Sequence, residues 1–357
     1  MPQKRIEARR SNGEGISASK GTGLTILGIE TSCDETSAAV LTDRGRILSS
    51  IVLSQDEIHS PYGGVVPELA SRQHIQSIGY VVGEALTRAG VPVDRIDAFA
   101  ATQGPGLIGS LLVGLSFAKG LAYYFGKALI PVDHCEAHVQ SAFIENPDIP
   151  FPSLALLVSG GHTTMFFLKE KLSFRILGRT RDDAAGEALD KIAKFLGLGY
   201  PGGPVIERLA HEGNIKKFPF SLPRMSDRSL DFSFSGLKTA ALRQIKENRI
   251  GGDQAGLSDF LASFQGGVIK ALLVNVSHAA KDFQPQSVIL CGGVARNKAL
   301  RKEFQKFASR RGIRAFIPSP EFCTDNAVMV ASLAMEKIAS GEKMGLDMGL
   351  NAYPRVP

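Results

Sequence analysis

Two histidines four positions apart carry the clearest chemical signal in this sequence. In His134-Cys135-Glu136-Ala137-His138 they fall on one face of a predicted helix, close enough to share a metal ion. Two ordinary polar helix residues have the same spacing, so that alternative stays open for the pair alone. The segment differs from the zinc-protease pattern H-E-x-x-H, because Glu136 stands two places after the first histidine and faces away from the ligand side. The pattern favours a two-histidine metal site over a protease.

A carboxylate is the third ligand that such a pair needs. Asp325 begins a predicted C-terminal helix, after a predicted strand over 314–318. Two histidines and one carboxylate suit iron or zinc and leave coordination positions open for a substrate. The same aspartate is equally well explained as a helix cap, so spacing leaves both roles open.

An acid-rich helix start precedes a glycine-rich loop at 197–204. Asp182 and Asp183 have the position of charges that complement a helix N-terminus. Glu187 and Asp190 are three residues apart and face one way, beside backbone that a sugar or phosphate can approach closely. Ligand binding and simple helix solvation both remain open here.

The elements that must position these residues form a regular pattern from Leu24 onward. Strand-length apolar runs alternate with longer amphipathic segments, which indicates an α/β chain. Residues 27–41 are predicted to form a strand, a small polar turn and a strand, and residues 154–168 repeat that plan. Such a repeat is typical of a duplicated domain. A third turn follows the predicted strand at 287–291 and leads into a helix at Lys298.

The three glycine-rich turns suit an anionic or nucleotide ligand, because backbone N–H groups and a helix N-terminus meet there. The sequence contains no P-loop motif and no G-x-G-x-x-G after the first strand, which argues against P-loop and Rossmann folds. The turns instead resemble the phosphate-1, phosphate-2 and adenosine turns of the actin, Hsp70 and sugar-kinase superfamily. That resemblance implies nucleotide binding in a cleft between two duplicated lobes.

Length and composition predict about two domains in a reduced, cytoplasmic chain. The chain has 357 residues, and its four cysteines are scattered without a C-x-x-C pair. No uninterrupted apolar run is long enough to cross a bilayer, and the first twenty residues have no apolar core, so we expect neither a membrane span nor a secretory signal. A targeting peptide is disfavoured by Glu7 and Glu14.

The domain boundaries follow from these patterns. Residues 1–22 form a basic tail that we expect to be disordered. We place the N-terminal lobe at 23–148 and the C-terminal lobe at 149–324, with a helix at about 325–357 that completes the N-terminal lobe.

The net charge of +6 permits a nucleic-acid partner without requiring one. Between 216 and 238, cations alternate with phenylalanines, and the candidate tRNA contacts are Lys216, Lys217, Arg224 and Arg228. Such a strip can contact phosphate and stack an unpaired base, although its phenylalanines can equally anchor a loop to the core. A second basic face over 298–311 is better explained as a solvated helix.

Further motifs stand in a fixed order between residue 26 and about residue 340. They are Ile29–Thr36, Pro67–Arg72, Gly104–Leu111, His134-x-x-x-His138, Val158–Thr163, Asp182–Glu187, Tyr200–Pro204, Phe234–Lys238 and Gly292-Gly293-Val294-Ala295-x-Asn297. In composition and order they resemble the universal tRNA threonylcarbamoyladenosine transferase family, once known as O-sialoglycoprotein endopeptidases. His162 after Ser-Gly-Gly resembles the bacterial and organellar branch.

The resemblance implies a duplicated actin-like ATPase fold and a defined reaction. Family members transfer the threonylcarbamoyl group from threonylcarbamoyl-AMP to N6 of adenosine 37 in tRNAs that read ANN codons, which forms t6A and releases AMP. It also implies one divalent metal ion, iron(II) in preference to zinc(II), and no organic cofactor.

Carried over position by position, the resemblance implies metal ligands at His134, His138 and Asp325. It implies a substrate-binding set made of Leu157, Val158, Ser159, Gly160, Gly161, Asp190, Gly203 and Asn297. Asp34 and Glu35 in the first turn match acids linked to activity, and both remain candidates for the general base.

The implied partners are tRNA, threonylcarbamoyl-AMP, a smaller inactive paralogue of the same fold and a P-loop ATPase, with no membrane. Three rival functions remain open: a nucleotide-regulated interaction protein, a small-molecule kinase and a metalloprotease. The kinase is weakened because only Asp34 and Glu35 resemble a base that activates a hydroxyl.

Overall fold

Two mixed sheets with their helices confirm the predicted α/β class. The computed structural model describes residues 7–8, 23–42, 45–222, 227, 229–251, 254–341 and 352–354. The chain divides into unit 1, made of residues 1–58, 65–144 and 325–357, and unit 2, made of residues 59–64 and 145–324. The short segment 59–64, which sequence patterns left in the N-terminal lobe, groups with unit 2, where Lys194 donates a hydrogen bond to the Tyr62 carbonyl.

Unit 1 is built on a six-stranded sheet in the order β1-β4-β3-β2-β5-β6. Its strands are β1 (Glu7–Ala8), β2 (Thr25–Glu30), β3 (Glu35–Thr42), β4 (Arg46–Ser54), β5 (Ala98–Gly104) and β6 (Ala128–Asp133). β2 pairs antiparallel with β3, ending with Glu30 opposite Ser37, and parallel with β5. The first predicted strand, turn and strand therefore lie at the centre of this sheet.

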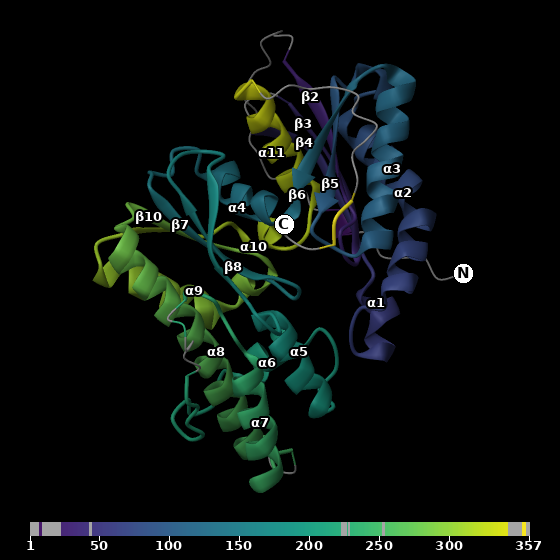
Figure 1. The fold of residues 1–357 in the computed structure, drawn as a ribbon. Coiled ribbons are helices and arrows are strands. Elements are labelled where there is room, and N and C mark those ends of the chain that lie inside the picture. The colour runs from purple at the N-terminus through teal and green to yellow at the C-terminus, as the bar shows by residue number, and fades with distance from the viewer. Residues whose placement is uncertain are drawn as a thin grey trace. The chain divides into compact units, whose positions relative to one another are not determined.

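Helices cover both faces of the unit 1 sheet (Figure 1). The helices of unit 1 are α1 (Asp56–His59, which runs into unit 2), α2 (Pro67–Ala89), α3 (Ile108–Phe125), α4 (His134–Glu145) and α11 (Ala327–Ala339). Those that pack on the sheet are α2 and α3 on one face and α11 on the other. Leu27 and Ile29 of β2 belong to the core under α2 and α3, whereas Gly28 between them faces α11. This alternation is the two-residue period of a strand that is buried on both faces.

Most of the basic tail at 1–22 lies outside the described residues, so its predicted disorder is not addressed there. The exception is β1, which pairs antiparallel with Ile51 and Val52 of β4. These two residues extend the edge of the sheet.

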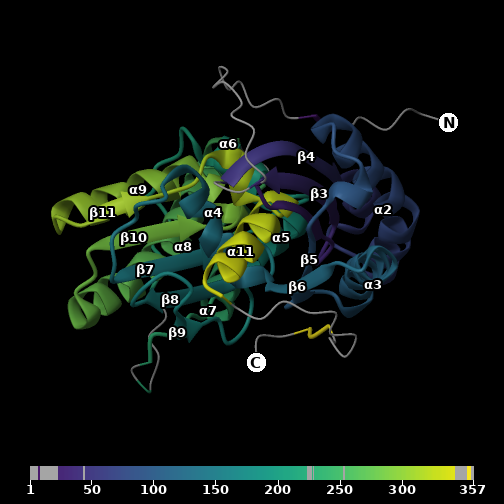
Figure 2. The same ribbon diagram turned by 90° about the horizontal axis from the view of Figure 1, so that it is seen from above.

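Unit 2 contains a five-stranded sheet in the order β11-β10-β7-β8-β9, which Figure 2 shows beside its helices. Its strands are β7 (Ser153–Val158), β8 (Thr163–Leu168), β9 (Phe174–Arg179), β10 (Ser287–Cys291) and β11 (Arg314–Phe316). Its helices are α5 (Ala185–Phe195), α6 (Gly202–Ala210), α7 (Ser235–Glu247), α8 (Gln254–Phe283), α9 (Lys298–Arg310) and α10 (Pro320–Cys323). Among the described residues, 3-10 turns are formed by η2 (Ser60–Tyr62) and η4 (Gly293–Arg296) in unit 2 and by η3 (Val93–Arg95) in unit 1. Read from its other edge, this sheet runs β9-β8-β7-β10-β11, and its strands correspond one by one to β4-β3-β2-β5-β6 of unit 1. This correspondence confirms the predicted duplication.

Two described helices, α3 and the Gly256–Phe283 part of α8, are long and apolar enough to cross a membrane. The expectation of no membrane-spanning segment did not anticipate these helices, because it was based on uninterrupted apolar runs. α3 packs on the unit 1 sheet, and 61% of the α8 window is buried in unit 2. Helices in the core of a soluble protein can be equally long and apolar. Length and composition therefore do not show whether α3 or α8 spans a membrane.

Replacing Gly28 should destabilise unit 1. A Cβ at Gly28 would lie 2.6 Å from the Ala327 carbonyl oxygen and 2.9 Å from the Ala331 Cβ, so α11 would have to shift. We expect Gly28→Ala to cost about 1–3 kcal/mol of unfolding free energy, as overpacked cores do. Gly79→Ala is the matched control, because Gly79 lies within α2 with open space around its Cβ position, and we expect a gain of up to about 1 kcal/mol. Equal urea midpoints for the two variants would contradict this account of the α11 contact.

Candidate metal centre

The two histidines lie at the start of α4 and are buried. His134 is the first residue of the helix, where the Asp133 carboxylate accepts a hydrogen bond from the Glu136 backbone N–H at 3.0 Å. The imidazole rings of His134 and His138 meet edge to face with centroids 4.6 Å apart. The predicted spacing therefore places both rings on one buried face.

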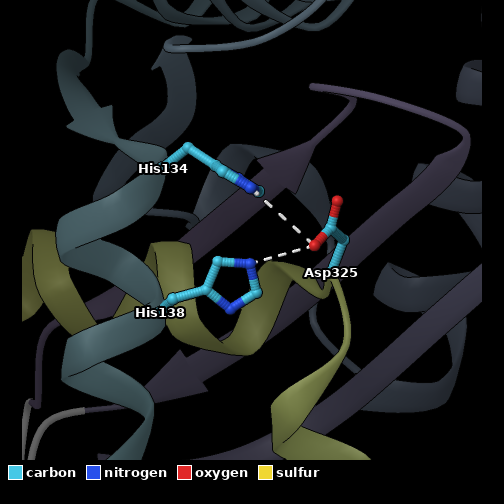
Figure 3. A group of neighbouring side chains, drawn as sticks. All are labelled: His134, His138 and Asp325. Carbon is cyan, nitrogen blue, oxygen red and sulfur yellow. Dashed lines mark hydrogen bonds and ion pairs between the residues drawn. The ribbon is translucent and has the colours of Figure 1, made fainter. Parts of the chain in front are cut away.

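Asp325 faces the two histidines from the segment before α11 (Figure 3). Its Oδ1 lies 3.0 Å from His138 Nε2 and 3.8 Å from His134 Nε2. One ligand atom from each residue lies within 4.8 Å of the others. All three residues belong to unit 1, so a single unit supplies the whole cluster.

The alternative role of Asp325 as a helix cap is wrong. The Asn326 side chain accepts the hydrogen bond from the Met329 N–H and is the N-cap of α11. Ser37 Oγ accepts from the Ala327 N–H at 2.9 Å and ties the start of the helix to β3. Asp325 therefore lies outside the helix and next to the histidines.

The sequence reading missed Glu30, which orients His134. Glu30 ends β2 with no solvent exposure, and its Oε2 lies 3.2 Å from His134 Nδ1. Its carboxylate also accepts hydrogen bonds of 2.5 Å from the Ser32 N–H and from the Thr102 hydroxyl. A carboxylate that holds the second nitrogen of a ligating histidine fixes the ring and leaves Nε2 for the metal. In the sequence, the available indication was that Glu30 is a single acidic residue at the end of an apolar strand.

Charge in this cluster shifts three pKa values. Burial works against the charged form of His134, but the carboxylates of Asp325 and Glu30 raise its pKa to about 9. Burial would likewise raise the pKa of Glu30, yet the charge of His134 and the hydrogen bonds it receives lower it. Burial and the charge of His134 lower the pKa of His138 despite its hydrogen bond to Asp325. Of the two imidazoles, His134 is therefore the one that favours the charged form at neutral pH.

The donor set fits a divalent metal. Two imidazole nitrogens and a carboxylate oxygen converge, and this combination suits iron(II) or zinc(II) with open coordination positions. The buried Nδ1 of His138 has no hydrogen-bond partner among the described atoms, so the contacts of this ring lie on its Nε2 side. The second nitrogen of His134, by contrast, is held by Glu30.

Asp34 and Glu35 lie together in the turn between β2 and β3. Burial raises the pKa of Asp34, although hydrogen bonds from the side chains of Cys33 and Glu35 partly oppose the shift. Burial and the neighbouring charges of Asp34 and Asp325 raise the pKa of Glu35 further, well above its usual value. Burial and repulsion from neighbouring carboxylates therefore raise the pKa of both carboxyl groups, and that of Glu35 is raised further.

In unit 2, the turn after β7 lies against the start of α5. Gly186 N–H donates to the Ser159 carbonyl at 3.2 Å, and a Cβ at Gly186 would lie 2.6 Å from that oxygen. Leu157 and Val158 are buried in β7, whereas Gly160 and Gly161 are exposed and have no atom within 4 Å of a Cβ position. The exposed glycines leave backbone that a ligand can approach.

The other implied substrate residues hold the neighbouring helix ends. Asp190 Oδ1 accepts from the Gly202 N–H at 2.7 Å, at the start of α6, which also carries Gly203. Asn297 caps α9 by accepting from the Leu300 N–H, and its amide donates to Gln265 at 2.7 Å. Glu187, which spacing placed on one face with Asp190, instead bonds the Ala184 N–H and Lys191.

The basic strip of unit 2 does not offer its aromatic rings for stacking. Phe218 and Phe220 pack on Phe260, and Phe232 and Phe234 are buried. Lys217 forms an ion pair with Asp259 at 3.4 Å, while Arg224 and Arg228 lie outside the described residues. The alternative in which the phenylalanines anchor this loop is therefore correct.

Residues 46–332 match a family model described as tRNA N6-adenosine threonylcarbamoyltransferase. Curated proteins with that description include one from Clostridium perfringens, 47% identical over 93% of this chain and 97% of its own length, and one from Moorella thermoacetica, 46% identical over 94% and 98%.

Two solved structures share the fold at low sequence identity. Component A of (R)-2-hydroxyglutaryl-CoA dehydratase from Acidaminococcus fermentans matches with a TM-score of 0.53 and 16% identity, over 88% of this chain and 99% of its own. Full-length HypF matches with a TM-score of 0.58 and 14% identity, over 88% and 56%. These matches confirm the predicted actin-like ATPase fold and carry no argument about activity.

Metal binding should depend on both histidines. We expect His134→Ala/His138→Ala to weaken metal affinity on the order of 100-fold or more, since loss of even an outer partner costs ~10–100-fold. Elemental analysis of purified protein measures occupancy. His211→Ala/His278→Ala is the control, because both of these histidines are exposed and lie outside the cluster. Unchanged iron or zinc content in the folded His134/His138 variant would rule out this site.

Metal affinity should rise with pH up to about 9. His134, whose pKa is raised to about 9, must lose its Nε2 proton to bind a metal. The apparent affinity should therefore increase by roughly tenfold per pH unit from neutral pH and level off near 9. In Glu30→Gln the pKa of His134 falls, so the plateau should begin at a lower pH. Zinc titration against a chelator tests both curves, and a flat profile for the unmodified protein would contradict the assignment.

Proposed function

Because this chain belongs to the tRNA N6-adenosine threonylcarbamoyltransferase family, we propose that it uses threonylcarbamoyl-AMP to modify N6 of adenosine 37 in tRNAs that read ANN codons. The chain is a tRNA-modifying transferase by that membership. The observation that carries the finer proposal is the buried cluster of His134, His138 and Asp325, beside the acid pair of the first turn.

The proposed reaction is a transfer to an amine. N6 attacks the carbamoyl carbon, a C–N bond forms, the C–O bond to the phosphate breaks, and AMP leaves with the bonding electrons. N6 must also give up one proton. We assign that proton to the Asp34–Glu35 pair, because burial raises the pKa of both carboxyl groups and makes each a stronger base.

His134, His138 and Asp325 would hold the metal, with iron(II) favoured over zinc(II). Such an ion acts as a Lewis acid that polarises a carbonyl or phosphoryl oxygen. Glu30 keeps the His134 ring oriented, and the turn Ser32–Glu35 keeps the acid pair in the same unit.

We propose that unit 2 binds the adenylate through backbone rather than side chains. The exposed Gly160–Gly161 backbone before α5 and Gly203 in the first turn of α6 support this, because backbone near a helix N-terminus suits an anion. The neighbouring Gly202 N–H is already bonded to Asp190. Asp190 would act by holding the start of α6, and Asn297 by capping α9 after the third glycine-rich turn, as their hydrogen bonds indicate.

The protease alternative is disfavoured by the placement of Glu136. It lies on α4 at the position whose backbone N–H bonds Asp133, and it is not part of the ligand cluster. The family name rather than any contact argues against the kinase and interaction-protein alternatives.

The test is nucleoside mass spectrometry of unmodified tRNA incubated with the protein and preformed threonylcarbamoyl-AMP. We expect t6A with the unmodified chain, alone or with the two proposed partners, a smaller paralogue and a P-loop ATPase. Asp34→Asn and His134→Ala/His138→Ala should lose it. Absence of t6A in every combination would refute the proposed substrates.

We propose that α9, rather than the strip at Lys216, contacts the tRNA phosphates. Lys302, Lys306 and Arg310 are exposed on one thirteen-residue helix, and its single acid, Glu303, pairs with Lys306 at 2.6 Å. This helix is about 20 Å long, enough to follow several phosphates. Lys217 of the strip is paired with Asp259 much as Lys306 is paired with Glu303, so the preference for α9 rests on the exposed Lys302 and Arg310, for which the described residues show no ion pair.

Charge reversal on α9 should therefore weaken tRNA binding. We expect Lys302→Glu/Lys306→Glu/Arg310→Glu to lower the salt slope by about one unit for each lost contact, with adenylate affinity unchanged. Lys216→Glu/Lys217→Glu is the comparison and should change the slope less. Filter binding across a salt series measures both, and the reverse ranking would transfer the contact to the strip.

A further inference from the structure

The Pro67–Arg72 motif has no part in the site described above. It forms the first turns of α2, and the same helix presents His74 two residues later. His74 has no exposed surface, although it is one of few histidines in the chain. A buried imidazole requires partners for both nitrogens, so its contacts show what it holds.

Both ring nitrogens of His74 bind the acid turn and its neighbours. Nε2 lies 2.9 Å from the Cys33 carbonyl oxygen, and Nδ1 lies 2.8 Å from Thr36 Oγ1. Since a carbonyl can only accept, Nε2 carries the proton and donates it. Nδ1 is then an acceptor, which agrees with the Gln55 amide donor 3.4 Å away.

The turn is held at three consecutive carbonyls by three different segments. The Ser32 carbonyl accepts from the Leu107 N–H at 2.8 Å, before α3, and the Asp34 carbonyl accepts from the Gln55 N–H at 3.1 Å, after β4. His74 holds the middle carbonyl, that of Cys33, and is the side chain among these three donors. These three bonds fix the backbone that leads into Asp34 and into Glu35, the first residue of β3.

We infer that His74 is a positioning residue for the transfer reaction: from α2 it fixes the Cys33 carbonyl and so the placement of the Asp34–Glu35 pair. This inference rests on the proposed function, because it takes those acids to act in the transfer. His74 touches neither the metal ligands nor the glycine turns of unit 2 in any contact described, so its loss should act on the chemical step rather than on binding.

The side-chain geometry of two amides allows a sharp test. The amide of glutamine reaches the Nε2 position of histidine and can donate to the Cys33 carbonyl, whereas the shorter asparagine reaches only the Nδ1 position, toward Thr36. We expect His74→Gln to keep kcat within about threefold. His74→Asn should lower kcat by roughly 10–100-fold, as misplaced reacting groups do, with KM for tRNA and adenylate unchanged.

Ser77→Ala is the matched control on the same buried side of α2. Ser77 accepts a hydrogen bond from Gln73 at 2.8 Å and has no contact with the turn, so the variant loses a buried hydrogen bond while kcat is retained. Metal content and thermal midpoint are measured for all variants. Metal content should match between the glutamine and asparagine substitutions, whereas the asparagine variant should have the lower thermal midpoint, because it leaves the Cys33 carbonyl without its donor.

Each outcome decides a separate question. Equal kcat for His74→Gln and His74→Asn would overturn the positioning role, as would a drop in kcat for Ser77→Ala that equals that of His74→Asn. A change in KM or metal content without a change in kcat would also overturn it. If the unmodified protein forms no t6A under any condition, it is the proposed function that fails, and the thermal midpoints still report whether His74 supports the turn.

Discussion

A buried carboxylate at the end of β2 determines how unit 1 is organised. An ionised group at Glu30, fully removed from water, would cost several kcal/mol without partners. Its oxygens accept hydrogen bonds from the Ser32 N–H, the Thr102 hydroxyl and His134. These donors come from the turn after β2, from β5 and from the start of α4, so one charge holds three segments. The orientation of His134 as a metal ligand is a consequence of satisfying that charge.

The third ligand depends on a close helix–sheet contact. α11 can approach β2 because Gly28 has no side chain, and Ser37 binds the first N–H of the helix. Asn326 completes the helix end, so the Asp325 side chain is left outside the cap and faces α4. A larger residue at position 28 would move the ligand as well as the helix.

The two units use one strand order for different chemistry. In unit 1 the turn after β2 leads into two neighbouring acid side chains, Asp34 and Glu35, whose pKa values are raised by burial. In unit 2 the equivalent turn after β7 presents bare backbone at Gly160, and the start of α5 comes close to it because Gly186 leaves room at the Ser159 carbonyl. Duplication therefore supplied the scaffold, and the residues at the turns set what each half can bind.

The sequence by itself determined the elements and the residue types. Apolar periodicity and glycine turns depend on neighbours in the chain, so the duplicated α/β fold and the histidine pair on α4 could be predicted from spacing. The tertiary structure decided the rest. Asp325 lies 187 residues from His138, and only packing shows that Asn326 is the cap and Asp325 the candidate ligand. The role of Glu30 beside His134 was not predicted, and Phe218 could be interpreted either as a base-stacking residue or as a loop anchor. Neither side chain shows from its type alone whether it is buried. Local spacing sets which side chains share a face, but burial and pairing between distant segments arise only when the chain packs.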